Sequence, residues 1–252
     1  MSVIRHRSYV IRRNSVGAPP LVRPPSNERK IIMILLIRHG EADHHIHELT
    51  GGWTDSALTA KGLSQFAKLA ECLAKDFAGH PAPKVVASDL QRARTGAQII
   101  AEKLQAGPVE CFSFLREKNN GRAAGLSKKE AKAFYHPPLT GRELDHINYD
   151  GGETRRGFYE RTVRGFRKLV EQQTGDLIIV SHKGTIQNML FDWLGLSIEE
   201  VADKKISFDI RPASVTVLGV NKWGEHAVFD LNDTSYLYGR PQFQLFGFPF
   251  GE

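Results

Sequence analysis

Three short apolar runs, rich in β-branched residues, constrain the fold of this chain more than any other feature. They cover residues 33–37 (Met-Ile-Leu-Leu-Ile), 84–87 (Lys-Val-Val-Ala) and 177–180 (Leu-Ile-Ile-Val). Continuous runs of this kind are typical of strands that are buried on both faces. A polar turn and then a segment with helical spacing follow each of them. We therefore predict an α/β fold, a three-layer sandwich whose mostly parallel central sheet carries helices on both faces.

The segments between the runs predict amphipathic helices. Thr59 and Asp89 are each expected to cap the start of a helix, and Leu63 is expected to lie on the apolar stripe of the first one. Further helices are predicted over residues 155–173 and from about Thr185.

Two later segments, residues 214–220 and 226–231, alternate in the manner of edge strands that are joined by a turn at 221–224. No apolar run approaches the roughly 20 residues of a membrane span, so we expect no membrane segment. Cys72 and Cys111 provide neither a disulfide framework nor a zinc-ligand pair, which is consistent with a reducing compartment.

The excess of positive over negative charge lies in the first 32 residues. The formal net charge is +6, and residues 1–32 hold seven basic residues and one acidic residue. Subtracting these from the totals of 34 and 28 leaves 27 of each sign in residues 33–252. The remainder of the chain is therefore neutral, and we expect no nucleic-acid partner.

The basic segment 1–32 is expected to be a poorly ordered extension. It is rich in arginine and carries two Pro-Pro pairs, so an organellar transit peptide is one interpretation. A start codon assigned too far upstream is another, because Met33 directly precedes the first strand, and a regulatory arm is a third. We expect a cytoplasmic protein, with organellar import through residues 1–32 as the alternative.

Polar residues that suit an anion follow each apolar run. The first run ends in Arg38-His39-Gly40, Arg92 lies in the first turn after the second, and the third ends in Ser181-His182-Lys183-Gly184. Sites in open α/β sheets form outside the carboxyl ends of the strands, so these residues are expected to meet. Arginine and helix N-termini favour phosphate or carboxylate, and a neutral imidazole is a competent nucleophile toward phosphorus.

Six ordered motifs resemble those of the phosphoglycerate mutase-like histidine phosphatase superfamily, over about residues 33–237. They are Arg38-His39-Gly40-Glu41, Gly52-Trp53-Thr54-Asp55, Ser88-Asp89-Leu90-Gln91-Arg92-Ala93, Leu115-Arg116-Glu117, Gly151-Gly152-Glu153-Thr154 and Val180-Ser181-His182. The resemblance implies one phosphatase domain over residues 33–240, between the extension 1–32 and an aromatic tail over 241–252.

The resemblance also implies a role for each residue of the site. His39 would be the phosphorylated nucleophile, and Arg38, Arg92 and His182 would hold the phosphoryl oxygens. Glu117 would protonate the leaving oxygen and then deprotonate the attacking water. No metal and no organic cofactor is implied, and the partner would be a small phosphorylated molecule.

The residues expected to contact the substrate include departures from the family pattern. They are His45, Gly51, Lys183 and Gly184. His45 stands where asparagine is common, which predicts an imidazole donor and a dependence of activity on pH. Lys183 stands where glycine is frequent and predicts a second anionic group on the substrate, unless this lysine is merely solvated. Gly51 precedes Gly52, where mutases usually have serine or threonine before one glycine.

Three alternatives to a phosphatase site remain open in the sequence. A phosphoglycerate mutase would use the same intermediate, but mutases of this family carry a longer insertion than the interval between Glu117 and Gly151 allows. An inactive module that recognises a phosphorylated partner is the second. The third is a metal site at the cluster His44, His45 and His47.

Structural roles are the alternatives for single residues. Arg92 would pair with Asp89 or Glu153, and His182 would cap the following helix. The phenylalanines of the tail would cover the core or a subunit contact, which leaves a homodimer open, and a lipid-facing role is less favoured; these residues are Phe243, Phe246, Phe248 and Phe250. Residues 118–150 are expected to determine the substrate.

Overall fold

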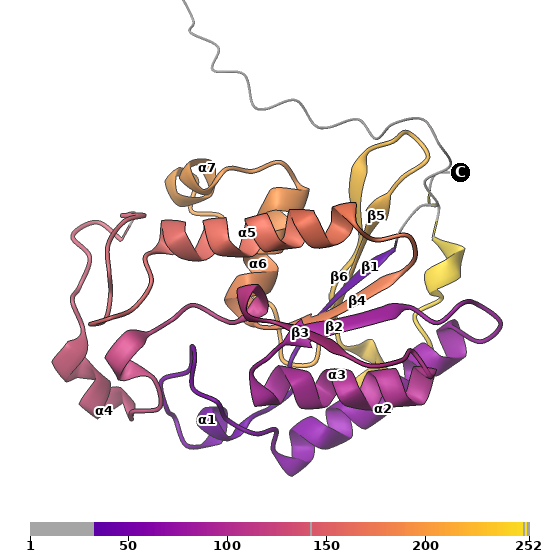
Figure 1. The fold of residues 1–252 in the computed structure, drawn as a ribbon, viewed down its shortest axis with the longest axis horizontal. Coiled ribbons are helices and arrows are strands. Elements are labelled where there is room, and N and C mark those ends of the chain that lie inside the picture. Colours follow the sequence, from indigo (N-terminus) through magenta and orange to yellow (C-terminus); the bar gives the residue numbers. More distant parts are fainter. Residues whose placement is uncertain (1–32, 142, 249, 251–252) are drawn as a thin grey trace, which may run out of the picture.

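The computed structural model describes residues 33–141, 143–248 and 250, which form a six-stranded sheet with helices on both faces (Figure 1). The strand order is β3-β2-β4-β1-β5-β6. The first four strands in this order run parallel, and β5 and β6 are antiparallel to their neighbours. The strands are β1 (Ile34–Arg38), β2 (Lys84–Ser88), β3 (Glu110–Phe112), β4 (Leu177–Ser181), β5 (Val215–Val220) and β6 (His226–Asp233). The predicted α/β sandwich with a mostly parallel sheet is confirmed.

The helices form the two outer layers. Helices α2 and α3 cover one face of the sheet, and α5 and α6 cover the other (Figure 1). The α-helices are α1 (Asp43–Ile46), α2 (Ala60–Asp76), α3 (Gln91–Leu104), α4 (Lys128–Ala131), α5 (Arg155–Glu171), α6 (Lys183–Trp193) and α7 (Ile198–Asp203). The 3-10 helices are η1 (Ser113–Leu115), η2 (Gly121–Ala123), η3 (Lys132–Phe134), η4 (Ser235–Tyr238) and η5 (Leu245–Gly247).

Strand β1 lies inside the sheet and is buried on both faces. Leu35 and Ile37 point into the core beneath α2 and α3, while Ile34 and Leu36 point into the core beneath α5 and α6. All four side chains are at most 1% exposed. Because successive side chains of a strand point to opposite faces, this burial explains the continuous apolar run.

Two strand predictions were incomplete. We expected β5 to be an edge strand, but it pairs with β1 on one side and β6 on the other, so its first five residues are buried. The short strand β3 was not predicted, because two of its three residues are exposed and it carries no apolar pattern.

The helix starts confirm one predicted cap and correct another. The hydroxyl of Thr59 accepts a hydrogen bond from the backbone N–H of Gly62 at 3.1 Å, as predicted. Asp89 does not cap α3, because its carboxylate instead binds Arg116 through two hydrogen bonds of 2.7 Å. Leu63 was also placed wrongly, since its side chain is 42% exposed.

The aromatic tail contributes in part to the core. Phe243 is buried and meets Tyr236 edge-on, and Phe248 and Phe250 pack against the core in part. Phe246 remains 38% exposed and stacks on His80 with ring centroids 3.5 Å apart. The predicted extension 1–32 lies outside the described residues. No described helix has the length and apolar character needed to cross a membrane.

Candidate active site

The carboxyl ends of three strands bring the predicted residues together. His39 directly follows β1, Arg92 lies in the first turn of α3 after β2, and His182 is the N-cap between β4 and α6. The backbone N–H of His39 donates to the carbonyl of Ser181 at 2.9 Å, so the ends of β1 and β4 are joined directly. The ring centroids of His39 and His182 lie 5.1 Å apart.

His39 is buried and is held in one tautomer. Its Nδ1–H donates to the carbonyl of Gly40 at 2.8 Å, and its Nε2 accepts from Nε of Arg92 at 3.3 Å. Burial, followed by the charge of Arg92, holds the pKa of His39 well below its ordinary value. The ring is therefore neutral near pH 7, and the lone pair of Nε2 is the one that a phosphorus atom would meet.

Arg92 is fixed from the opposite side by two backbone carbonyls. Its side chain donates to Gly52 O at 2.8 Å and to Thr54 O, and the residue is 1% exposed. Burial lowers the pKa of Arg92 to about 10, so the guanidinium stays charged near pH 7. Neither Asp89 nor Glu153 pairs with it, so the surface ion pair weighed above does not form.

His182 and Arg38 both present buried nitrogen atoms that bond no described residue. These atoms are Nδ1 and Nε2 of His182 and Nε of Arg38. His182 makes no side-chain cap for α6, which excludes the capping alternative. Nη1 of Arg38 donates to the carbonyl of Ile210 at 2.6 Å, which orients the guanidinium. Burial is the main cause that lowers the pKa of both side chains.

His45 supplies a further N–H group beside Arg38. The backbone N–H of Ala42 donates to Nδ1 of His45 at 3.2 Å, so the neutral ring carries its proton on Nε2. This Nε2 lies 3.4 Å from Nη2 of Arg38, and both groups are donors, an arrangement that suits an anionic acceptor. Burial lowers the pKa of His45 to about 4. The pH dependence expected from this residue therefore falls below the neutral range.

Two backbone N–H groups hold the carboxylate of Glu117. Its Oε1 accepts from Lys118 N at 2.8 Å and its Oε2 accepts from Gly184 N at 2.9 Å. A Cβ on Gly184 would lie 2.4 Å from Oε1, so only glycine leaves room for the carboxylate there. The charge of Glu117 also raises the pKa of Arg38 and Arg92 against the larger effect of burial, so it lies near both guanidinium groups.

The two remaining predicted substrate contacts have other neighbours. Nζ of Lys183 forms an ion pair with Asp209, and its side chain is 41% exposed. A Cβ on Gly51 would lie 3.3 Å from Cδ2 of His44, so Gly51 lies against that ring.

The histidine cluster differs from the predicted metal set. One ligand atom each from His39, His44 and His45 lies within 4.8 Å of the others, and His47 is not among them. However, the Nε2 of His45 carries a proton while Ala42 holds its Nδ1, and this proton blocks the lone pair that a metal would need. From the sequence, His44 was placed in the metal alternative and not in the phosphate site. It is 7% exposed, with its pKa lowered to about 3, first by burial.

The model of the histidine phosphatase superfamily (branch 1) matches residues 34–234. The broad-specificity phosphatase YOR283W of Saccharomyces cerevisiae is 28% identical over 77% of this chain and 81% of its own length. A 2,3-bisphosphoglycerate-dependent phosphoglycerate mutase of Allorhizobium ampelinum is 30% identical over 74% of this chain and 95% of its own.

The structure of mycobacterial glucosyl-3-phosphoglycerate phosphatase Rv2419c has the same fold. It superposes with a TM-score of 0.64 and 24% identity, covering 81% of this chain and all of its own. The family match covers most of the chain, and so does the shared fold. The chain belongs to the histidine phosphatase superfamily.

Proposed function

We propose that the protein is a metal-independent phosphatase that hydrolyses a small phosphate monoester through a phosphohistidine intermediate on His39. One observation carries the proposal: in a buried site, the lone pair of His39 Nε2 accepts a hydrogen bond from the Nε–H of Arg92. The nucleophile and the phosphate-binding charge are thereby oriented before substrate arrives.

The reaction proceeds in two displacements at phosphorus. Nε2 of His39 attacks, the bond from phosphorus to the ester oxygen breaks, and Glu117 in its acid form protonates the leaving oxygen. Glu117 then takes a proton from water, which attacks the phosphohistidine and releases inorganic phosphate. The donors of Arg38, Arg92, His45 and His182 bind the phosphoryl oxygens in both steps.

A mutase is the second candidate, and mutases among the relatives favour it. A mutase would return the phosphoryl group from His39 to a second hydroxyl of its substrate. The interval from Glu117 to Gly151 is short, and its described residues form α4 and the two 3-10 helices η2 and η3. This short interval lacks the insertion that the family resemblance assigns to mutases, and so favours water as the acceptor.

The test is a panel of phosphate esters that includes 3-phosphoglycerate with 2,3-bisphosphoglycerate. Released phosphate and product isomer are measured with the wild type and with His39→Ala. We expect free phosphate from the wild type and none from the variant. Isomerised phosphoglycerate with little free phosphate would establish the mutase instead. Phosphate binding without turnover of p-nitrophenyl phosphate between pH 4 and 9 would indicate a binding module.

A further inference from the structure

The loop that carries Glu117 includes η1 and receives several hydrogen bonds from side chains elsewhere in the chain. It spans residues 113–117, between the edge strand β3 and the site. Ser181 Oγ donates to Leu115 O at 2.7 Å, Thr185 Oγ1 to Arg116 O at 2.9 Å and Trp53 Nε1 to Glu117 O at 2.8 Å. The position of the Glu117 backbone is thus set by groups outside the loop.

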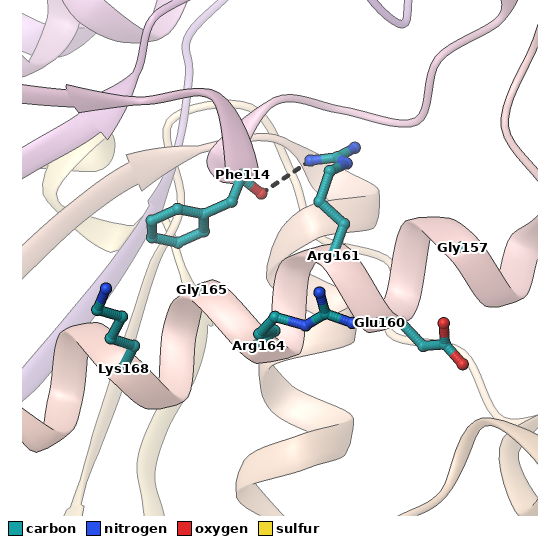
Figure 2. Close-up of a pocket in the computed structure, with 7 residues that line it drawn as sticks. All are labelled: Phe114, Gly157, Glu160, Arg161, Arg164, Gly165 and Lys168. Atoms are coloured by element: carbon teal, nitrogen blue, oxygen red, sulfur yellow. Dashed lines mark hydrogen bonds between the residues drawn. The ribbon is translucent and has the colours of Figure 1, made fainter.

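Arg161 of helix α5 contributes most of these bonds. Its Nη1 donates to the carbonyls of Ser113, Phe114 and Arg116 at 3.2, 2.9 and 3.3 Å. Its Nη2 donates to Arg116 O at 3.4 Å and to Glu117 O at 3.2 Å. Figure 2 shows the guanidinium rising from the helix to the Phe114 carbonyl. One side chain therefore binds four of the five carbonyls of the loop.

Glu153 extends this arrangement to the chain beyond Glu117. Its carboxylate pairs with Arg161, with Nε to Oε1 at 2.7 Å and Nη2 to Oε2 at 2.9 Å. The same Oε2 accepts from the backbone N–H of Asn119 at 2.8 Å. The backbone is therefore tied down on both sides of Glu117 by one ion pair, whose side chains are 23% and 20% exposed.

The neighbours of Arg161 on the same helix provide a contrast. Arg164 and Lys168 line a pocket with Arg161 and the ring of Phe114, which lies over Gly165 (Figure 2). The side chains of Arg164 and Lys168 form no hydrogen bond or ion pair with a described residue. The donors of Arg161 all point away from this pocket, into the loop and onto Glu153. Its role is therefore different from that of the cations beside it.

We infer that Arg161 is a positioning residue that holds Glu117 where it can protonate the leaving group. The inference rests on the proposed function, since it assumes that Glu117 is the general acid. A rigid loop matters because misplacing a catalytic group by about 1 Å can cost roughly a hundredfold in rate. The hydrogen bonds of Arg161 go to the loop carbonyls and to Glu153, and its charge also contributes to lowering the pKa of His182.

The test compares two substrates of similar size that differ in how much they need an acid. p-Nitrophenyl phosphate has a good leaving group, whereas phenyl phosphate has a poor one that requires protonation. The ratio kcat/KM reports the step in which the ester bond breaks. It is measured for the wild type, Arg161→Gln, Glu117→Gln, the double variant, and Arg164→Gln as the matched control.

We expect Arg161→Gln to lower kcat/KM for phenyl phosphate about tenfold more than for p-nitrophenyl phosphate, a moderate part of the effect of a general acid. Glu117→Gln should also lose more kcat/KM for phenyl phosphate than for p-nitrophenyl phosphate. Adding Arg161→Gln to it should not increase this difference, since both substitutions act through one group. Arg164→Gln should leave both values within about twofold of the wild type, as for surface substitutions in general.

An equal loss for the two esters in Arg161→Gln, or a further leaving-group preference in the double variant, would overturn the positioning role. If Glu117→Gln shows no greater loss for phenyl phosphate while the wild type is active, Glu117 is not the acid and the positioning role falls with it. The phosphatase proposal itself is then decided by His39→Ala. Should circular dichroism show Arg161→Gln to be unfolded, Glu153→Gln takes its place. It removes the ion pair, keeps the side-chain volume, and must show the same preference for the inference to stand.

Discussion

Nε of Arg92 and Nε2 of His39 face one another at 3.3 Å inside the protein. The other nitrogens of Arg92 are held by the carbonyls of Gly52 and Thr54, so the guanidinium cannot turn away from the imidazole. A phosphoryl group that approaches Nε2 therefore meets a charge that is already oriented. Such fixed groups stabilise developing charge without the cost of reorganisation during the reaction.

Arg92→Lys is expected to lower kcat/KM by about 10²–10³, because an ammonium group cannot replace the oriented guanidinium donors. It should also lower the free energy of unfolding by about 1–3 kcal/mol, since buried carbonyls lose their partner. Phosphate release assays and urea unfolding measure the two effects. Arg94→Lys, on the exposed side of the same helix, is the control and should change neither. A nearly active Arg92→Lys enzyme would contradict this account.

The stability of the fold is expected to fall as the pH is lowered from 7 to 5.5. The folded-state pKa values of His39, His44, His45 and His182 all lie below the ordinary value of about 6.5. In this window the unfolded chain binds protons that the folded protein does not. The stabilisation that these histidines contribute is therefore present above about pH 6.5 and is lost as the pH falls below it. Each fully coupled histidine contributes up to about 1.4 kcal/mol per pH unit.

Urea unfolding in phosphate-free buffer at pH 7.0, 6.0 and 5.5 measures this slope. The window lies above the ordinary pKa values of carboxylates, which limits their contribution. His45→Asn removes one of the four groups and should give a shallower slope. A free energy of unfolding that stays constant across the window would show that the histidines are not buried in neutral form.

His45→Asn is expected to retain kcat/KM within about fivefold, because the side-chain amide offers an N–H donor in place of Nε2–H. His45→Leu removes the donor and should lose about 10²-fold, as for one donor to a developing charge. The profile of kcat/KM between pH 6 and 8 should be the same for wild type and His45→Asn, since the pKa of His45 is about 4. An ionisation in that range that disappears in His45→Asn would refute the assigned protonation state.

Gly184→Ala is expected to reduce activity about tenfold with little effect on stability. The new Cβ would lie 2.4 Å from Oε1 of Glu117 and 3.0 Å from Cε1 of Phe158. The carboxylate is the flexible end of a side chain, so we expect it to move while the ring shifts by a few tenths of an ångström. A displaced acid loses part of the factor of about 10²–10⁴ that general acid catalysis provides. Thermal unfolding measures the effect on stability, and turnover of phenyl phosphate measures the effect on activity. A large fall in Tm would show that the helix start, rather than the carboxylate, gives way.

The sequence predicted the parts of the fold that follow from burial. The runs that became β1, β2 and β4 are continuous because helices cover both faces of the sheet. β3 was not predicted because its residues are mostly exposed. β5 was predicted at an edge because its partner β1 is distant in the sequence. The Asp89 cap failed because a long-range partner, Arg116, competes for the carboxylate.

The candidate site was predictable where strand ends fix it, and less so elsewhere. His39, Arg92 and His182 meet because parallel strands deliver their carboxyl ends to one edge. The contact of Lys183 with Asp209 and the burial of His44 depend on loops whose course no local pattern specifies. The role of Arg161 was not predictable either. The sequence places this arginine on the polar side of an amphipathic helix, where a solvent-exposed side chain is expected unless the position of the loop is known.

The burial of β1 makes its backbone open to solvent less often than the segment 118–150. Arg38 ends a strand buried between two helical layers, and His39 directly follows it. We expect the amides of this strand to exchange only when the domain as a whole unfolds. The described residues of the segment 118–150 form short helical turns and isolated bridges, so hydrogen exchange should be faster there than in β1. We therefore expect that the segment proposed to select the substrate can open locally, or change in sequence, without moving His39. Selectivity can therefore evolve at little cost to the phosphoryl-transfer geometry.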